Sequence, residues 1–420
     1  MKKLLQLFNS NHPLKNLITY GIGQGFNLIT PLLVIPYIVS VCSEEGYGKI
    51  SVGMALAFFL IVFIDYGSDI VGVKEVSVNR ENREKLEKVF VTMYLAKSIM
   101  LVVVCALVSI VFFTVPYFSH EKALFFLSLF IAVGQFVNPT WFLQGIENFK
   151  WITILNIISK IIYVVGIFFF IQKPSDYIYN NLFWGIGMIV ANGIAFVYVC
   201  RTYHFSFMVA QRDEVYGLIR TNFSMFSSQI FVSLQMYAPI VLVSFFGSNT
   251  MAGQYKIVDQ IIVVFKTYIL LFFNYAYPRV CFLLEKNVKE GLRFWKLYNG
   301  VNMVFIIVSM AVIYVFSDEI VAYFNPASPT EIGAFLRIAV FIPILQSIGI
   351  PLKQLVIGWN KQREYITLTM TSTVISMVLI LVAIPFFKIP GLIYSLILTE
   401  FVTIVFFFSA IKNNLFQRGS

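Results

Sequence analysis

Long apolar segments, interrupted by short polar ones, occupy nearly the whole of this 420-residue chain. A helix needs about 20 apolar residues to cross the hydrocarbon core of a bilayer, and about twelve segments reach that length. The composition agrees, because 59% hydrophobic and 12% charged residues, with a mean hydropathy of +0.81, exceed what a soluble core can hold. The pattern therefore predicts an all-α polytopic membrane protein with helices at 16–40, 50–72, 90–116, 123–144, 152–172, 181–200, 222–246, 254–278, 297–316, 332–357, 366–387 and 391–411.

Basic residues outside the apolar segments are distributed unevenly between the two sides of the membrane. With the N-terminus placed in the cytoplasm, 21 of the 31 Lys and Arg residues are cytoplasmic, and only Lys49, Lys122, Lys173 and Lys388 lie opposite. The positive-inside rule then places both termini of this multi-pass protein in the cytoplasm. The first segment is too long for a signal peptide and should stay in the mature chain. Topology and anionic lipid headgroups explain the net charge of +10, so we expect no nucleic-acid partner.

Internal repetition divides the predicted helices into two sets of six. The sequence EEGYGKI at 44–50 resembles MAGQYKI at 251–257, with an offset of 207 residues. The pair Asn27 and Pro31 likewise resembles Gln235 and Pro239, with an offset of 208. Repeats in register with a six-helix period are typical of transporters that work by alternating access. We therefore predict two lobes, 1–208 and 209–420, around a central cavity.

Six Lys and Arg residues lie inside apolar segments, where a cation costs about 2.5 to 3.5 kcal/mol and usually marks a site or a path. They are Lys97, Lys160, Lys256, Lys266, Arg337 and Lys353. Long side chains near the end of a span can snorkel to water, which is our interpretation of Lys97, Arg337 and Lys353. For Lys256 both snorkelling and contact with an anionic passenger stay open. Lys160 and Lys266 lie near the middle of their segments, and we expect these two to meet an anionic passenger.

Four carboxylates also lie within the apolar segments: Asp65, Asp69, Asp259 and Glu400. Asp259 is one turn from Lys256 and about two turns from Lys266 on the same helical face, so the spacing predicts a column of alternating charge. Structural ion pairing is one explanation of such acids. The other is ion coupling through Asp259, Glu400 or Asp65, because a carboxylate in a low dielectric is poised to exchange a proton.

Polar residues form a stripe in the first helix of each predicted lobe. Gln24 and Asn27 share one face of the first helix with Pro31, and Gln235 precedes Pro239 in the seventh. Helix–helix hydrogen bonding explains such residues one by one. Matching stripes favour a shared polar cavity in which amides donate to and accept from sugar hydroxyls.

Signatures of an enzyme are missing from the sequence. There is no P-loop, paired-histidine motif or nucleophile elbow, so we expect no ATP hydrolysis, no catalytic residues and no cofactor. The four cysteines lack metal-ligand spacing, and we expect neither a metal site nor disulfides. The longest non-cytoplasmic segment, 317–331, is too short for a folded domain. Transport is the better first hypothesis.

Two segments, 36–90 and 138–161, resemble the polysaccharide-transporter branch of the multidrug/oligosaccharidyl-lipid/polysaccharide flippase superfamily, and within it the Wzx O-antigen flippases. The resemblance covers essentially the whole chain in length and repeat. Its motif residues are Gly46, Tyr47 and Gly48, then Asp65, Gly67 and Glu75, and then Trp141, Gly145 and Glu147.

This resemblance implies a flippase of the bacterial inner membrane. It would move an undecaprenyl-pyrophosphate-linked oligosaccharide repeat unit from the cytoplasmic to the periplasmic leaflet for O-antigen, and hence lipopolysaccharide, synthesis. The bilayer, and the polymerase and chain-length proteins of the same pathway, are then its partners. Lys160, Lys266 and Lys256 would bind the pyrophosphate, while the polar stripes would face the sugars. Two alternatives stay open: a drug exporter of the same superfamily, and a membrane-embedded polysaccharide polymerase or ligase. A net-positive cavity argues against the first and the short loops against the second.

Overall fold

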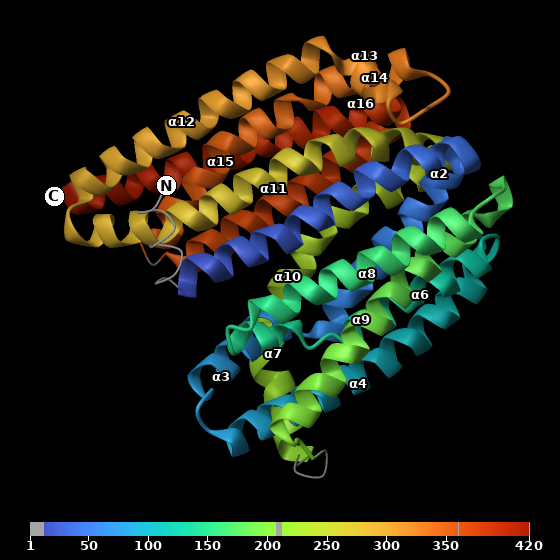
Figure 1. Cartoon of the computed structure of the whole chain (residues 1–420). Helices are drawn as coiled ribbons and strands as arrows, with labels where there is room; N and C mark the ends of the chain where they lie inside the picture. The colour runs from blue at the N-terminus through green and yellow to red at the C-terminus, as the bar shows by residue number, and fades with distance from the viewer. Residues whose placement is uncertain (1–11, 207–211, 360, 420) are drawn as a thin grey trace, which may run out of the picture. The chain divides into compact units, whose positions relative to one another are not determined.

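The computed structural model describes residues 12–206, 212–359 and 361–419, and this part of the chain is helical without strands (Figure 1). The all-α prediction is confirmed. In chain order the elements are α2 (His12–Asp65), the π-helix η1 (Ser68–Gly72), α3 (Val73–Val78), α4 (Arg83–Thr114), α5 (Pro116–Ser119), α6 (Lys122–Phe136), α7 (Thr140–Gly145), α8 (Phe149–Phe170), the 3₁₀ helix η2 (Pro174–Ile178), α9 (Tyr179–Tyr203), α10 (Arg212–Phe246), α11 (Asn249–Lys286), α12 (Val288–Val315), α13 (Ser317–Ala322), α14 (Pro329–Ala339), α15 (Phe341–Gly358) and α16 (Gln362–Gly419).

The described helices account for the twelve predicted passes. Nine stretches within the described residues are long and apolar enough to cross a membrane. Two of these hold two passes each, because α2 breaks at Ser43 (φ 64°) and α16 at Lys388 (φ 53°). A left-handed backbone at a residue other than glycine cannot continue a right-handed helix. With α11, a further helix of 38 residues, the passes number twelve.

Contacts between residues divide the chain into two compact units. Unit 1 comprises Met1–Cys42 and Lys49–Ser233, and unit 2 comprises Ser43–Gly48 and Leu234–Ser420. The division therefore falls inside α10. The boundary that the sequence predicts, between 208 and 209, lies in 207–211, outside the described residues. The two lobes 1–208 and 209–420 thus stay a prediction.

Aromatic side chains form the core of unit 1, where α9 packs against both α6 and α8. The buried ring of Phe90 on α4 lies 4.7 Å from Tyr94, 5.8 Å from Trp141 and 5.3 Å from Phe142, measured between ring centroids. Offset and edge-on aromatic pairs at such distances add to the energy of burial. This cluster ties α4 to α7 and holds the neighbouring polar residues in place.

Unit 2 is built from long helices, with α15 packed against α16 and α11 packed against α12 and α15. Its core includes the buried side chains of Leu284, Leu355, Val356 and Phe407. Figure 1 shows α15 running alongside parts of α11 and α12. Helices that run alongside one another can present side chains from several turns to one another.

Two glycines of unit 2 meet at a helix crossing. A methyl group added to Gly48 would overlap the carbonyl oxygen of Asn249, and one added to Gly253 would overlap that of Glu44. An offset of 205 residues carries Glu44 to Asn249 and Gly48 to Gly253, so the contact is reciprocal. Glycine permits this approach because it has no Cβ. The two segments that resemble each other in sequence therefore pack against each other.

Candidate functional site

The clearest charged group in unit 2 is a column along α11. The Nζ of Lys256 lies 2.8 Å from a carboxylate oxygen of Asp259, and the Nζ of Lys266 lies 3.8 Å from the other. The predicted column of alternating charge is therefore present on α11. Each lysine side chain is 29% exposed and that of Asp259 is 17% exposed. The group carries one more positive charge than negative, and the longer contact exceeds hydrogen-bond distance, so Lys266 is held more loosely than Lys256.

A small cavity adjoins this charge column. Asp259 and Lys266 line it together with Tyr255 of α11, Ile342 of α15 and Leu396 of α16. Its volume is about 10 Å³, close to the lower limit for holding one water molecule. In this conformation the space beside Lys266 therefore has no room for a pyrophosphate or a sugar.

Lys160 occupies an aromatic site in unit 1. It lies on α8, and its Nζ is 3.3 Å from the centroid of the Trp184 ring on α9. Trp184 is fixed in turn by Phe58 and Tyr163, whose rings stand edge-on to it. A lysine over the face of an indole is stabilised by the ring quadrupole. Among the described residues Lys160 forms no ion pair, so no carboxylate there competes for its amino group.

Lys97 does not snorkel, and that prediction is wrong. Its side chain on α4 is 1% exposed and lies 2.8 Å from Asp65, which is 8% exposed. The Nε2 of Gln135 donates to the other Asp65 oxygen at 2.8 Å, and Lys97 also donates to the Gln135 carbonyl at 3.4 Å. Asp65 is available because α2 ends there, with Tyr66 and Gly67 at positive φ. An intramembrane cation with a buried partner gains nothing from reaching water.

Glu400 has a different kind of partner. The Nε2 of Gln346 on α15 donates to its carboxylate at 2.7 Å. Across residues 12–206, 212–359 and 361–419, Glu400 takes part in no ion pair. The Oε1 of Gln346 is buried without a hydrogen-bond partner. A protonated Glu400 would supply the missing donor, since an acid and an amide can pair through two hydrogen bonds.

The other two membrane cations have partners in unit 2. Arg337 on α14 donates to Asp318 on α13 at 2.8 Å, and both side chains are 34% exposed. The Nζ of Lys353 on α15 lies 5.8 Å from the centroid of the Phe407 ring. Both side chains are partly exposed, and their snorkelling stays a prediction.

The amides predicted to bind sugars belong to different units of the structure. Asn27 is half-buried in unit 1 and Gln235 is half-buried in unit 2. Gln24 belongs to α2, but its side chain lies outside those that the structure describes. Their role stays a prediction. Sequence reasoning missed Gln135, Gln346 and Trp184, which act as neutral partners of charged residues and carry no charge that would single them out in an apolar segment.

No group of His, Cys, Asp and Glu that could hold a metal ion occurs among the described side chains. Oxygen and nitrogen ligands for a resident ion would have to converge at one point. Three acids of the spans, Asp65, Asp259 and Glu400, are paired with lysines or amides instead.

The sequence of this chain is similar to a known family and to known proteins. A family described as "Polysaccharide biosynthesis protein" matches residues 14–281. A protein of Escherichia coli (strain K12), named "Putative O-antigen transporter", is 21% identical over 411 residues, covering 95% of this chain and 97% of that protein. One of the same name from Shigella dysenteriae is 19% identical over 407 residues, covering 95% and 100%.

Two solved structures share the fold. The lipid II flippase MurJ in an inward closed conformation has a TM-score of 0.75 and 15% identity, covering 94% of this chain and 87% of MurJ. An inward-facing multidrug resistance transporter of the MATE family has a TM-score of 0.69 and 13% identity, covering 94% and 99%. At this identity the likeness shows the fold alone.

Proposed function

Because this chain belongs to the polysaccharide biosynthesis protein family, we propose that it flips an undecaprenyl-pyrophosphate-linked oligosaccharide repeat unit across the bacterial inner membrane. The passenger would move from the cytoplasmic to the periplasmic leaflet by alternating access, with both termini in the cytoplasm. The chain is a transporter and not an enzyme, and its curated relatives are likewise named as transporters. The polymerase and chain-length proteins of surface-polysaccharide synthesis would then receive its product.

The observation that carries this proposal is the unequal sharing of Asp259 between two lysines. One carboxylate cannot neutralise both, and Lys266 keeps its contact only at 3.8 Å. A pyrophosphate carries several negative charges, so it can displace this weak contact and gain a charge-assisted hydrogen bond from Lys266. In a region of low dielectric such an interaction is far stronger than in water. Lys256, whose Nζ lies 2.8 Å from Asp259, would stay paired with Asp259 or would contact the pyrophosphate only after Lys266 does.

Lys160 supplies a second candidate contact. Its partner is the face of Trp184 and not a carboxylate, so an anion can approach without competing against a fixed negative charge. Half-buried Asn27 and Gln235, with Gln24, would hydrogen-bond the sugars. The polyprenyl chain can stay in the lipid, because it needs no polar partner.

The test is surface display of the glycan in a strain whose own gene is replaced by variants of this chain. We expect Lys266→Gln to reduce display at least tenfold at unchanged protein level, and Lys266→Arg to retain most of it, because arginine keeps the charge. Lys122→Gln, at an exposed position at the start of α6, is the matched control. Normal display with Lys266→Gln would overturn the role of this lysine. Normal display after deletion of the whole chain would overturn the proposed function and favour a drug exporter.

We further propose that Glu400 carries the coupling proton. Two of the three candidate acids, Asp65 and Asp259, are each paired with lysine, whereas Glu400 is paired with an amide. An acid whose partner is a neutral amide can take up a proton without breaking an ion pair, and the buried Oε1 of Gln346 lacks a donor. The charged residues within the spans that pack against α16 are Lys353 on α15, Arg337 on α14, and Lys256, Asp259 and Lys266 on α11. Each of these residues contacts a partner other than Glu400.

Glu400→Gln tests this assignment, because glutamine keeps a hydrogen-bonding side chain of the same size and cannot titrate. In proteoliposomes we expect its flipping rate to fall at least tenfold and to lose its dependence on a proton gradient. Asp259→Asn is the comparison, and its rate should keep the pH profile of the unmodified protein. If Asp259→Asn flattens the profile and Glu400→Gln does not, the proton binds at Asp259.

A further inference from the structure

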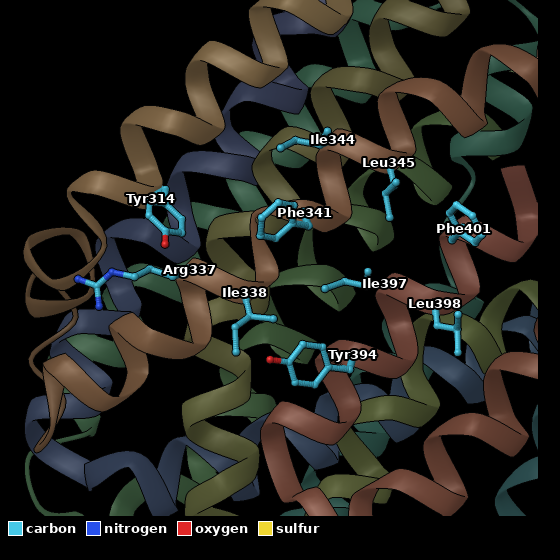
Figure 2. Close-up of a pocket in the computed structure, with 10 residues that line it drawn as sticks. All are labelled: Tyr314, Arg337, Ile338, Phe341, Ile344, Leu345, Tyr394, Ile397, Leu398 and Phe401. Atoms are coloured by element: carbon cyan, nitrogen blue, oxygen red, sulfur yellow. The ribbon is translucent and has the colours of Figure 1, made fainter.

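A groove of about 580 Å³ opens between α12, α14, α15 and α16 in unit 2 (Figure 2). Its volume falls within the range of about 300 to 1,000 Å³ that is typical of small-molecule pockets. Figure 2 shows Tyr314 and Arg337 together at one end, and Leu345, Leu398 and Phe401 at the other. The groove therefore has a polar end and an apolar body, which is the arrangement of a lipid and not of a sugar.

The dimensions and position of the groove suit one leaflet of a bilayer. Tyr394 and Phe401 both line it and lie seven residues apart on α16, which is about 10 Å along a helix. One leaflet contributes about half of the roughly 30 Å hydrocarbon core. Tyr314 lies one residue before the end of α12, so the polar end of the groove coincides with the end of a span. A molecule in the groove would have its head at the membrane surface and its chain in the hydrocarbon.

Arg337 is suited to an anionic headgroup. Its Nη2 donates to Asp318 at 2.8 Å, and its side chain is 34% exposed. A guanidinium has five N–H donors in a planar fork that matches phosphate geometry, so the contact with Asp318 leaves donors for a phosphate. In a bilayer, lipid must fill such a groove, because an empty one forfeits dispersion contacts along its walls.

We propose that this groove binds an anionic phospholipid of the bilayer, with one acyl chain along the apolar body and the phosphate on Arg337. Tyr314, at the same end of the groove as Arg337 (Figure 2), adds a hydroxyl that can donate to or accept from the headgroup. A phospholipid fits better than a polyprenyl lipid, because the groove extends over no more than one leaflet. The inference stands independently of the proposed function and of the orientation of the chain.

Native mass spectrometry of the purified full-length chain tests this site. The protein is given phosphatidylglycerol or phosphatidylcholine with the same acyl chains. We expect at least a fivefold preference for phosphatidylglycerol in the unmodified protein and a loss of that preference in Arg337→Gln. Leu398→Trp, which fills the apolar body, should reduce retention of both lipids. Val308→Trp, at an exposed position of α12 outside the groove, should leave retention unchanged.

A further variant separates lipid binding from the structural role of Arg337. Asp318→Asn also removes the ion pair but leaves the arginine free, so we expect it to keep or strengthen the preference for phosphatidylglycerol. If Asp318→Asn loses the preference as Arg337→Gln does, the effect of Arg337→Gln comes from loss of the ion pair and not from loss of a contact with a lipid phosphate. Equal retention of the two lipids by the unmodified protein would overturn the proposal. Retention of a polyprenyl phosphate in place of phosphatidylglycerol would overturn its assignment to a phospholipid.

Discussion

Lys97 and Lys266, two lysines that lie within apolar segments, have different surroundings in the structure. Lys97 is buried against Asp65 at 2.8 Å and belongs to a polar network with Gln135. Lys266 is 29% exposed and reaches its acid only at 3.8 Å. Depth within an apolar segment is all that the sequence offers, and for Lys97 it wrongly predicted snorkelling, whereas the role of Lys266 stays a prediction. The partners Asp65 and Lys97 are 32 residues apart, so no local spacing connects them.

We expect Lys97→Met to destabilise the protein by about 3 to 5 kcal/mol, because removing one partner of a buried ion pair leaves an uncompensated charge. The measurement is unfolding of the purified protein in detergent. The double variant Asp65→Asn with Lys97→Met should recover most of the loss, since it buries no unpaired charge. Lys353→Met is the control, because Lys353 contacts the Phe407 ring and forms no ion pair among the described residues. It should lower the free energy of unfolding only slightly. Equal effects of Lys97→Met and Lys353→Met would show that the Asp65 pair contributes nothing.

The breaks within α2 and α16 show what the sequence predicts well about elements. The apolar pattern leaves gaps at 41–49 and 388–390, and the helices break at Ser43 and Lys388 inside these gaps. Apolar length is a direct consequence of bilayer thickness, so it predicts spans reliably. The contact between Gly48 and Gly253 could not be predicted from the sequence, because similarity between two segments does not reveal that they touch.

Replacing either crossing glycine should weaken unit 2. Gly48→Ala or Gly253→Ala places a methyl group against a backbone carbonyl, and such overpacking typically costs about 1 to 3 kcal/mol. Gly300→Ala on α12 is the matched control, because its added Cβ would meet no atom within 4 Å and alanine favours the helix. Thermal unfolding in detergent should show a lower midpoint for the first two variants and an equal or higher one for the control. A control that unfolds as early as Gly48→Ala would contradict the role of the crossing.

At the scale of the whole molecule, transport requires that a passenger be released as well as bound. The fold class and the family could be predicted from apolar length, repeat and motif residues, whereas the strength of each ion pair could not, because a charge pattern does not say which lysine is neutralised. In the structure Asp259 lies 2.8 Å from Lys256 and 3.8 Å from Lys266. If these lysines bind the passenger, as we propose, Asp259 would compete with it for the same cations, and this competition would favour release.

Asp259→Asn removes the competitor and should separate binding from turnover. We expect the variant to bind a short-chain polyprenyl pyrophosphate about tenfold more tightly, a gain of about 1.4 kcal/mol, because Lys256 and Lys266 both become available. Glycan display should nevertheless fall several-fold, since a passenger held more tightly leaves more slowly. Calorimetry of the purified protein gives the affinity, and Asp318→Asn, at the separate pair with Arg337, serves as the control for loss of a carboxylate. Weaker binding by Asp259→Asn would mean that this acid orients the lysines and does not compete for them, because the passenger would then need the carboxylate in place.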